Sequence, residues 1–271
     1  MTIRGQVAQC QSPSHAALPL PPSASPVGPT ARYVAPGAAC QGSTPYYATV
    51  QAAVDAAADG DVVKIAAGTY SDVHQRQGSS QVVHIIKGVT LRGGYSVAGG
   101  VDLDCCGGST PVVGRNLIVD NRGGAWGGGV TVNGTNARLV NNIIARNEAT
   151  KGAGIWMDGA SGYPTGVTMT HNTLVGTPAA DGICADDQVI ATLANDIVAG
   201  FTVGISNTSP SGSTATAQAT LFYGDSIDHS GGVSSTAEVW GNPTLLVPGA
   251  GHYHVGPSSA AINRGQDSGP A

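Results

Sequence analysis

Along the middle of the chain, a glycine followed by a short apolar strand recurs four times. The copies are Gly129-Val130-Thr131-Val132, Gly154-Ile155-Trp156-Met157, Gly182-Ile183-Cys184-Ala185 and Gly204-Ile205-Ser206-Asn207. The second residues of these copies are separated by 25, 28 and 22 positions. A period of roughly 20–30 residues is typical of one coil of a parallel β-solenoid, in which each strand pairs with the strand one coil later. The pattern therefore predicts an all-β chain.

Alternation within the copies separates an inner face from an outer face. Successive side chains of a strand point to opposite faces, so the residue after each glycine is expected inside the solenoid. The inner column then contains Val130, Ile155, Ile183 and Ile205, and the first outer column contains Thr131, Trp156, Cys184 and Ser206. A second outer column contains Asn133, Asp158, Asp186 and Thr208. Because Ile155 and Met157 flank Trp156, this register is favoured over its one-residue slip.

A second repeated segment predicts a stack of asparagines. Three segments align on a central asparagine, namely Asn142, Asn172 and Asn195. Asparagine tolerates left-handed backbone geometry, and its side-chain amide can bond to the copies above and below it. We therefore interpret Asn142, Asn172 and Asn195 as a structural ladder at one bend of the solenoid rather than as ligands.

The start of the chain predicts a short cap before the repeat. Val50, Ala53, Val54 and Ala57 fall at helical spacing after Thr49, a good N-cap residue. A helix here would cover the apolar cross-section of the first coil. We therefore expect a disordered Pro/Ser-rich segment over 1–31, a parallel β-helix with its N-terminal cap over 32–240, and a C-terminal module over 241–271 that ends the solenoid.

Composition and charge narrow the classes of partner. The chain has 271 residues with 40 glycines and two phenylalanines, and 11% of its residues are charged, which disfavours a compact helical fold. The net charge is −5 without a basic cluster, so nucleic acid is not expected as a partner. No apolar run reaches the ~20 residues that a membrane span requires. We expect a monomer.

The cysteines do not indicate a metal site. Cys10, Cys40, Cys105, Cys106 and Cys184 match no zinc-binding spacing. Their odd number leaves at least one free thiol, and a disulfide between the adjacent Cys105 and Cys106 would be strained. In an exported protein, Cys40 could pair with Cys10 or with one of the two adjacent cysteines, and the sequence leaves this choice open. The N-terminus shows no apolar core of a secretory signal.

The outer columns bring together the strongest candidate site. Paired strands lie ~4.8 Å apart, so Asp158 and Asp186 are expected to stack beside Trp156, with Asp187 next to them. Two close carboxylates either share a proton or hold a cation, and calcium is a cation that prefers oxygen ligands. The indole of Trp156 offers a flat apolar surface for a sugar ring.

Several uses of this cluster remain open. Asp158, Asp186 and Asp187 are catalytic candidates, because paired carboxylates can cleave a glycosidic bond as acid and base. A lyase would need a different base, and Arg146 or Lys151, which precede the Trp156 strand, are candidates that would also contact the substrate. Alternatively, Asp158 and Asp186 bind calcium, or the aspartates are solvated surface residues without a function.

Both ends of the repeat carry a resemblance to a known family. Residues 33–37, 50–57 and 60–70 resemble the N-terminal cap of bacterial right-handed parallel β-helix proteins of the pectin-lyase-like superfamily. Residues 242–247, 252–255 and 258–265 resemble the C-terminal module of its choice-of-anchor subgroup of surface or secreted proteins. The resemblance implies a single-stranded right-handed solenoid and export of the protein.

The resemblance implies less about activity. The superfamily includes polysaccharide lyases, hydrolases, epimerases and proteins without a known reaction. Pectin-hydrolysing members carry Asn-x-Asp, a separated Asp-Asp, Gly-His-Gly and Arg-x-Lys, of which only Asp186-Asp187 has a counterpart here. Relatives also carry a second cysteine near the position of Tyr46 and continue beyond Asn263-Arg264-Gly265, so this chain resembles a fragment.

We therefore expect an exported or cell-surface β-helix protein that interacts with polysaccharide and has no reaction of its own. The alternative is an enzyme, either a polysaccharide lyase or a glycoside hydrolase, that acts on uronic-acid polysaccharide. A second alternative is an adhesin that binds a protein partner. The sequence leaves the substrate open in each case.

Overall fold

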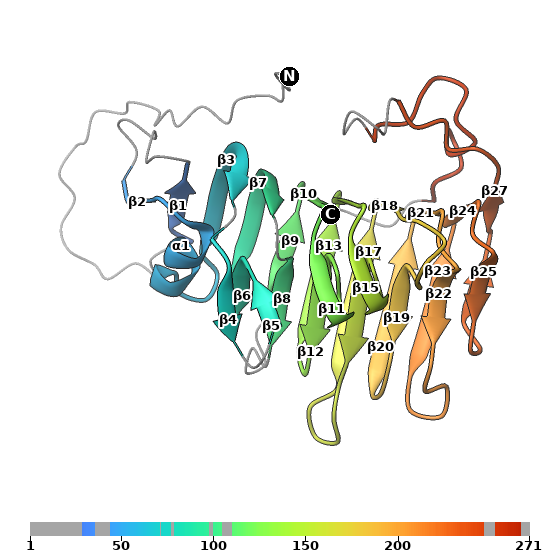
Figure 1. Cartoon of the computed structure of the whole chain (residues 1–271), viewed down its shortest axis with the longest axis horizontal. Coiled ribbons are helices and arrows are strands. Elements are labelled where there is room, and N and C mark those ends of the chain that lie inside the picture. Colours follow the sequence, from blue (N-terminus) through green and yellow to red (C-terminus); the bar gives the residue numbers. More distant parts are fainter. Residues whose placement is uncertain are drawn as a thin grey trace, which may run out of the picture.

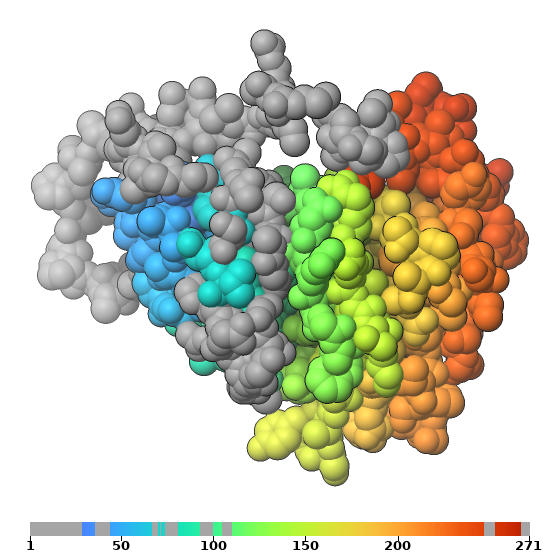
Figure 2. All heavy atoms as spheres, viewed as in Figure 1, coloured from blue at the N-terminus to red at the C-terminus, as the bar shows by residue number. Residues whose placement is uncertain are grey.

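In a computed structural model, the chain winds into a right-handed parallel β-helix whose coils follow one another along one long axis (Figure 1). The structure describes residues 29–35, 44–70, 72–76, 79–97, 100–104, 110–246 and 253–266. Cys10, Cys40, Cys105, Cys106 and most of the predicted disordered segment lie outside the described residues. Figure 2 shows the coils as adjacent slabs, in sequence order from blue to orange.

Three parallel sheets form the walls of the solenoid in the described ranges. The ten-stranded sheet contains, in spatial order, β2 (Tyr46–Tyr47), β1 (Ala31–Val34), β3 (Val62–Tyr70), β7 (Thr90–Val97), β9 (Val112–Gly114), β13 (Asn136–Val140), β17 (Thr165–Thr170), β20 (Val189–Ala194), β23 (Thr214–Gln218) and β26 (Ser234–Thr236). The seven-stranded sheet contains β25 (Ile227–Ser230), β22 (Val203–Asn207), β19 (Ile183–Ala185), β16 (Ile155–Asp158), β12 (Val130–Asn133), β8 (Val101–Asp104) and β6 (Val83–Ile85). The six-stranded sheet contains β10 (Leu117–Val119), β14 (Ile143–Ala145), β18 (Thr173–Val175), β21 (Ile197–Ala199), β24 (Leu221–Tyr223) and β27 (Val239–Trp240).

Two smaller strand pairs are added to these walls. β11 (Arg122–Trp126) pairs in parallel with β15 (Glu148–Lys151), and β4 (His74–Arg76) pairs in antiparallel fashion with β5 (Ser79–Gln81). A coil gives one strand to each wall, as β16, β17 and β18 do. The β11–β15 pair lies at the bend between the six-stranded and the seven-stranded sheets.

The predicted register of the glycine-strand repeat is confirmed. Val130 pairs with Ile155, Ile155 pairs with Ile183, and Ile183 pairs with Ile205. All four side chains are fully buried, with 0% exposure. They belong to one continuous core that runs through the solenoid. Burial of this apolar column therefore stabilises the stacking of the coils.

The glycines before these strands are required by the close approach of successive coils. A Cβ atom on Gly129 would lie 2.7 Å from the carbonyl oxygen of Gly154, and one on Gly154 would lie 2.8 Å from the carbonyl oxygen of Gly182. That oxygen of Gly182 already accepts hydrogen bonds from the N–H groups of Gly154 and Ile155, at 2.9 Å each. Because the pairing fixes the oxygen in place, a larger residue at Gly154 would push the coils apart.

An asparagine ladder occupies the bend between the ten-stranded and the six-stranded sheets. The Oδ1 of Asn142 accepts bonds from the backbone N–H and the Nδ2 of Asn116, both at 3.1 Å. Asn172 holds Asn142 in the same way, with both bonds at 3.0 Å. The next rung is Asp196, whose Oδ1 accepts the backbone N–H and the Nδ2 of Asn172 at 2.6 and 2.9 Å. The ladder thus contains Asn142 and Asn172, but its next member is not Asn195.

The prediction of Asn195 was wrong by one residue, and the backbone gives the reason. The residue before each rung has a left-handed conformation, with φ of 56° at Asn141, 59° at His171 and 59° at Asn195. Asparagine is tolerated in that conformation as well as in the ladder. Asn195 therefore occupies the left-handed backbone position, while the next residue, Asp196, makes the hydrogen bonds of the ladder.

The N-terminal cap is confirmed. α1 (Val50–Ala56) begins after Thr49, whose hydroxyl oxygen accepts the N–H of Ala52 at 3.1 Å. Val50, Ala53 and Val54 are buried in the end of the core. Among the described residues, no helix has the length and apolar character needed to cross a membrane.

A polar pair lies at the C-terminal end of the core. His229 pairs with the fully buried Ile205 and so continues the inner column into the last coil. Its Nε2 lies 2.7 Å from the Oε1 of Glu238, and its ring lies against Phe222 with centroids 5.9 Å apart. The apolar column therefore ends in an imidazole and a carboxyl group rather than in a helix.

The C-terminal module folds back onto the six-stranded sheet. Tyr253 is buried in a small cluster with Val119 and Ala145. Further along, the N–H of Gln266 donates to the Oδ1 of Asn195 at 2.7 Å, and the Nδ2 of Asn195 donates to the carbonyl oxygen of Gln266 at 2.9 Å. Asn195 therefore anchors the end of the described chain.

The aspartate rung of the ladder makes stability depend on pH. Burial raises the pKa of Asp196 to about 7, although N–H groups of Asn172 and Ala194 oppose this shift. Because the folded protein binds this proton more tightly, the stabilisation is fully present below the ordinary pKa of 3.8 and is lost as the pH rises through about 7. We expect Asp196→Asn to remove this loss.

Urea unfolding between about pH 4 and about pH 7 measures the effect. The free energy of unfolding of the wild type should fall by on the order of 3 kcal/mol more than that of Asp196→Asn across this range. Parallel pH profiles for the two proteins would show that Asp196 does not bind a proton preferentially in the fold.

Candidate functional site

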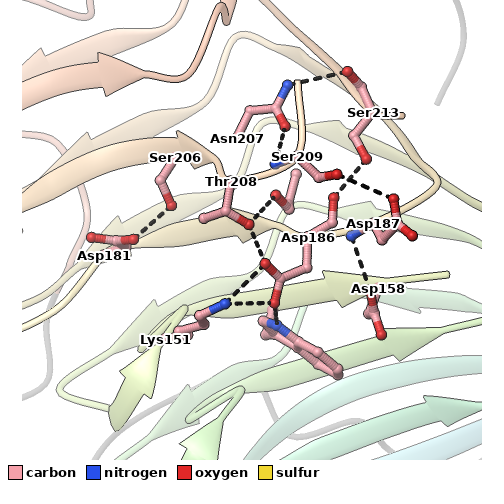
Figure 3. A network of polar contacts seen from close by, with 12 residues as sticks. Lys151, Asp158, Asp181, Asp186, Asp187, Ser206, Asn207, Thr208, Ser209 and Ser213 are labelled. Carbon is pink, nitrogen blue, oxygen red and sulfur yellow. Dashed lines mark hydrogen bonds and ion pairs between the residues drawn. The ribbon is translucent and has the colours of Figure 1, made fainter. Parts of the chain in front are cut away.

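A polar cluster lies on the outer face of the seven-stranded sheet, beside the β11–β15 pair. Lys151 ends β15, Trp156 lies on β16, and Asp186 directly follows β19. Figure 3 shows Lys151 and Thr208 converging on Asp186, with Ser209 on the neighbouring loop. Successive coils therefore contribute to one cluster, as the predicted stacking requires.

Asp186 is the centre of this cluster. Its two carboxylate oxygens accept hydrogen bonds from the Nζ of Lys151 at 3.0 Å each. The indole Nε1 of Trp156 donates to Oδ2 at 2.9 Å, and the hydroxyl of Thr208 donates to Oδ1. Both oxygens are therefore engaged, in a side chain that is only 18% exposed.

These bonds fix the charge of the pair. Partial burial alone would raise the pKa of Asp186, but hydrogen bonds from Thr208, Trp156 and Lys151 outweigh it and hold the pKa below its ordinary value. The hydrogen bonds to Asp186 raise the pKa of Lys151 in turn. At neutral pH the cluster therefore contains a carboxylate and an ammonium group that neutralise each other.

Asp158 and Asp187 flank the centre. The Oδ1 of Asp158 accepts the backbone N–H of Asp187 at 3.0 Å, and the Oδ1 of Asp187 accepts the hydroxyl of Ser209 at 3.1 Å. Burial raises the pKa of Asp158, and the nearby charges of Asp186 and Asp187 raise it further. Asp158 and Asp186 are thus neighbouring carboxyl groups whose pKa values shift in opposite directions.

A second tryptophan extends the aromatic surface. Trp126 pairs with Lys151 across the β11–β15 pair. The ring centroids of Trp126 and Trp156 are 5.8 Å apart, with the planes tilted by 34°. Because Trp126 is 52% exposed, the two indoles form a surface that faces solvent beside Lys151 and Asp186. We call this the tandem tryptophan surface.

A cleft adjoins the same strand pair. Its volume is about 560 Å³, and its lining includes Arg122, Glu148 and Thr150. Arg122 and Glu148 face each other across the pair, with Nε and Oε2 3.2 Å apart. Both ends of the β11–β15 pair therefore carry groups that can contact an extended ligand.

Of the residues predicted for the site, Arg146 lies elsewhere. It follows β14 in a left-handed bend, with φ of 54°. Its guanidinium pairs with Asp120 at 2.6 Å and donates to the hydroxyl of Tyr253 in the C-terminal module. Arg146 therefore ties that module to the solenoid, and its assignment to the substrate site was wrong.

Two residues of the first outer column are buried, although alternation predicts that they face solvent. Cys184 and Ser206 point away from the core but are 0% and 4% exposed. The hydroxyl of Ser206 donates to the Oδ2 of Asp181 at 2.6 Å, in the segment that leads into β19. Burial raises the pKa of the free Cys184 thiol to about 11, so this thiol is protonated at neutral pH.

A lysine supplies positive charge beside Asp186, for which calcium was one of the alternatives considered from the sequence. Lys151 binds Asp186, while Asp158 is bonded to the backbone of Asp187. In the part of the chain that the structure describes, no group of three or more His, Cys, Asp or Glu side chains is arranged to hold a metal ion. The carboxylate of Asp186 therefore has a counter-ion within the protein.

Trp126 and Thr208 belong to the cluster but not to the predicted site. Trp126 stands 25 residues before Lys151, which is also the interval between Val130 and Ile155. Thr208 follows Asp186 by 22 residues, which is the interval between Ile183 and Ile205. The repeat interval is therefore a signal that could have found Trp126, and it had already placed Thr208 in the outer column of Asp186 without assigning it to the site.

Chemically, the cluster combines a flat aromatic surface with groups that donate and accept hydrogen bonds.

Comparisons with known protein families, with curated proteins and with solved structures found no match to this chain.

We expect Asp186→Asn to destabilise the fold, because the amide leaves Lys151 without its counter-ion and replaces one acceptor oxygen by a donor. The free energy of unfolding in urea should fall by about 1–3 kcal/mol. Asp187→Asn is the matched control, since the exposed Asp187 side chain is bonded to Ser209 alone among the described residues. Its effect should stay within about 0.5 kcal/mol, and equal losses in the two variants would contradict a central role for Asp186.

Proposed function

We propose that this chain is an exported or cell-surface protein that binds polysaccharide through the tandem tryptophan surface without transforming it. The finer assignment, to the choice-of-anchor subgroup of the pectin-lyase-like superfamily, is part of the proposal and draws on the terminal segments of the sequence. The observation that carries the proposal is the pair of adjacent indoles, Trp126 and Trp156, on neighbouring coils.

Two indoles in series suit a polymer of sugars. The flat, apolar face of each indole can pack against the apolar face of one sugar ring. The ring centroids of Trp126 and Trp156 are 5.8 Å apart, and the two residues belong to neighbouring coils. A glycan chain that runs along the solenoid axis would therefore meet both rings in turn, whereas a single ring would suffice for a small ligand.

The Lys151–Asp186 pair gives the surface its polar selectivity. An ammonium group has three donors, and Asp186 accepts two hydrogen bonds from Lys151. Because the Lys151 side chain is 43% exposed, a donor remains accessible for a ligand. The carboxylate of a uronic acid would accept such a charge-assisted bond more strongly than a neutral hydroxyl group. Acidic polysaccharides are therefore the class of ligand that we expect.

One observation favours a second candidate, a polysaccharide lyase or glycoside hydrolase. The opposite pKa shifts of Asp158 and Asp186 resemble the division between a proton donor and an ionised base. However, both oxygens of Asp186 are bonded within the protein, so it would have to release a partner before reacting. Binding without reaction therefore fits the geometry better.

Substitution of either tryptophan tests the binding proposal. We expect Trp126→Ala and Trp156→Ala each to weaken the affinity for a uronic-acid polysaccharide by about tenfold, because a central aromatic contact is lost. Quenching of tryptophan fluorescence or calorimetry with polygalacturonate and alginate measures the affinity. Trp240→Ala is the control, since Trp240 is 65% exposed in β27, away from β11 and β16. Equal affinities in all of these proteins would overturn the proposal.

A product assay separates binding from catalysis. The same polysaccharides, incubated with the wild-type protein with and without calcium, should yield neither new reducing ends nor unsaturated products. Product that disappears in Asp158→Asn, while binding persists, would instead establish the enzyme candidate.

A further inference from the structure

A groove lined by arginines lies on a different wall of the solenoid, on the outer face of the ten-stranded sheet. Its volume is about 200 Å³, and Arg92, Arg115 and Arg138 line it together with Asn141. Arg92 lies on β7, Arg115 directly follows β9, and Arg138 lies on β13. Three neighbouring strands therefore bring one arginine each to the same hollow, which we call the arginine groove.

A glycine creates the hollow. Gly114 of β9 pairs with Arg92 on one side and with Val140 on the other. Because Gly114 has no side chain, the floor of the groove at this position is backbone. A Cβ atom there would lie 3.4 Å from the carbonyl oxygen of Val140, which is an ordinary contact, so the backbone leaves room for a methyl group. Gly114 therefore differs from Gly154, where the close approach of the next coil leaves no space for a Cβ atom.

The three arginines differ from most other basic residues because nothing in the described chain neutralises them. The engaged basic side chains are Arg32 with Asp61, Lys87 with carbonyl oxygens at the end of α1, Arg122 with Glu148, Arg146 with Asp120, and Lys151 with Asp186. By contrast, the side chains of Arg92, Arg115 and Arg138 are exposed and form no hydrogen bond or ion pair with any described residue. Three like charges around one small hollow repel one another unless an anion lies between them.

The backbone holds this arrangement in place. Arg115 has a left-handed conformation with φ of 62°, and its N–H donates to the carbonyl oxygen of Val140 at 3.0 Å. It directly precedes Asn116, the first rung of the ladder, which is buried and bonded to Asn142. The rigid bend therefore fixes the point from which the Arg115 side chain leaves the chain.

We propose that the arginine groove is a binding site for an oxyanion, that is, a carboxylate, sulfate or phosphate group on a small molecule or on one unit of a polymer. Guanidinium groups bind such anions through paired, charge-assisted hydrogen bonds. The groove has room for one such group and a small part of its carrier. This site is independent of the tandem tryptophan surface, which lies on another wall and contacts sugar through indoles.

The test compares three probes, namely sodium phosphate, sodium sulfate and sodium galacturonate, at constant ionic strength set with sodium chloride. Isothermal titration calorimetry of the wild-type protein should show saturable binding of at least one probe. Arg92→Gln, Arg115→Gln and Arg138→Gln should each weaken that binding by about tenfold, since each removes one charged donor group. The probe that binds best identifies the anion, and galacturonate would indicate an acidic sugar.

Controls separate a binding role from a structural role. Arg264→Gln also removes an exposed positive charge, in the C-terminal module, and should leave probe affinity unchanged. Without a probe, the three groove variants should unfold at the same or a higher urea concentration than the wild type, because like-charge repulsion is relieved. Absence of saturable binding, equal weakening in Arg264→Gln, or a loss of stability in the groove variants without anion would each overturn the proposal.

Discussion

Parallel backbone pairing between successive coils is the constraint on which the rest of this structure depends. It places each residue directly beside the residue one coil later. Side chains of one type therefore form a column in which the same contact is repeated from coil to coil. Isoleucines stack into a core, and asparagines pass hydrogen bonds from coil to coil. Glycines such as Gly154 allow the coils to approach until only a hydrogen atom fits against the neighbouring carbonyl oxygen.

Much of this architecture can be predicted from the sequence. Burial of an apolar side chain away from water is strongly favourable, so the alternation of apolar and polar residues indicates which face of a strand points into the core. Ile155 and Trp156 were assigned to the correct faces for that reason. Asn195 was misassigned because residue type alone cannot distinguish a backbone preference from a bonded position. Arg146 was misassigned because it is itself a left-handed residue at a bend, where strand alternation does not predict the direction of a side chain. Cys184 is buried although alternation places it on the outer face, because alternation does not describe the packing of the segments between strands.

The chain distributes its charges in two contrasting ways. Beside the β11–β15 pair, Lys151 and Asp186 neutralise each other, so the tandem tryptophan surface presents mainly flat apolar area with a few oriented polar groups. On the ten-stranded sheet, the arginine groove keeps its positive charge although the chain as a whole carries −5. A local excess of one sign, within a protein of the other sign, concentrates the field where a ligand can enter.

The return of the C-terminal module has a consequence for how the molecule comes apart. A solenoid whose coils touch only their neighbours can fray from an open end, one coil after another. Here Tyr253 is bonded to Arg146 and Gln266 is bonded to Asn195, so the segment that follows the last coil is fastened to coils well inside the molecule. Detaching the final coils would require breaking these ties as well. Under a pulling force or in the presence of a protease, the C-terminal half is therefore expected to unfold as one cooperative unit.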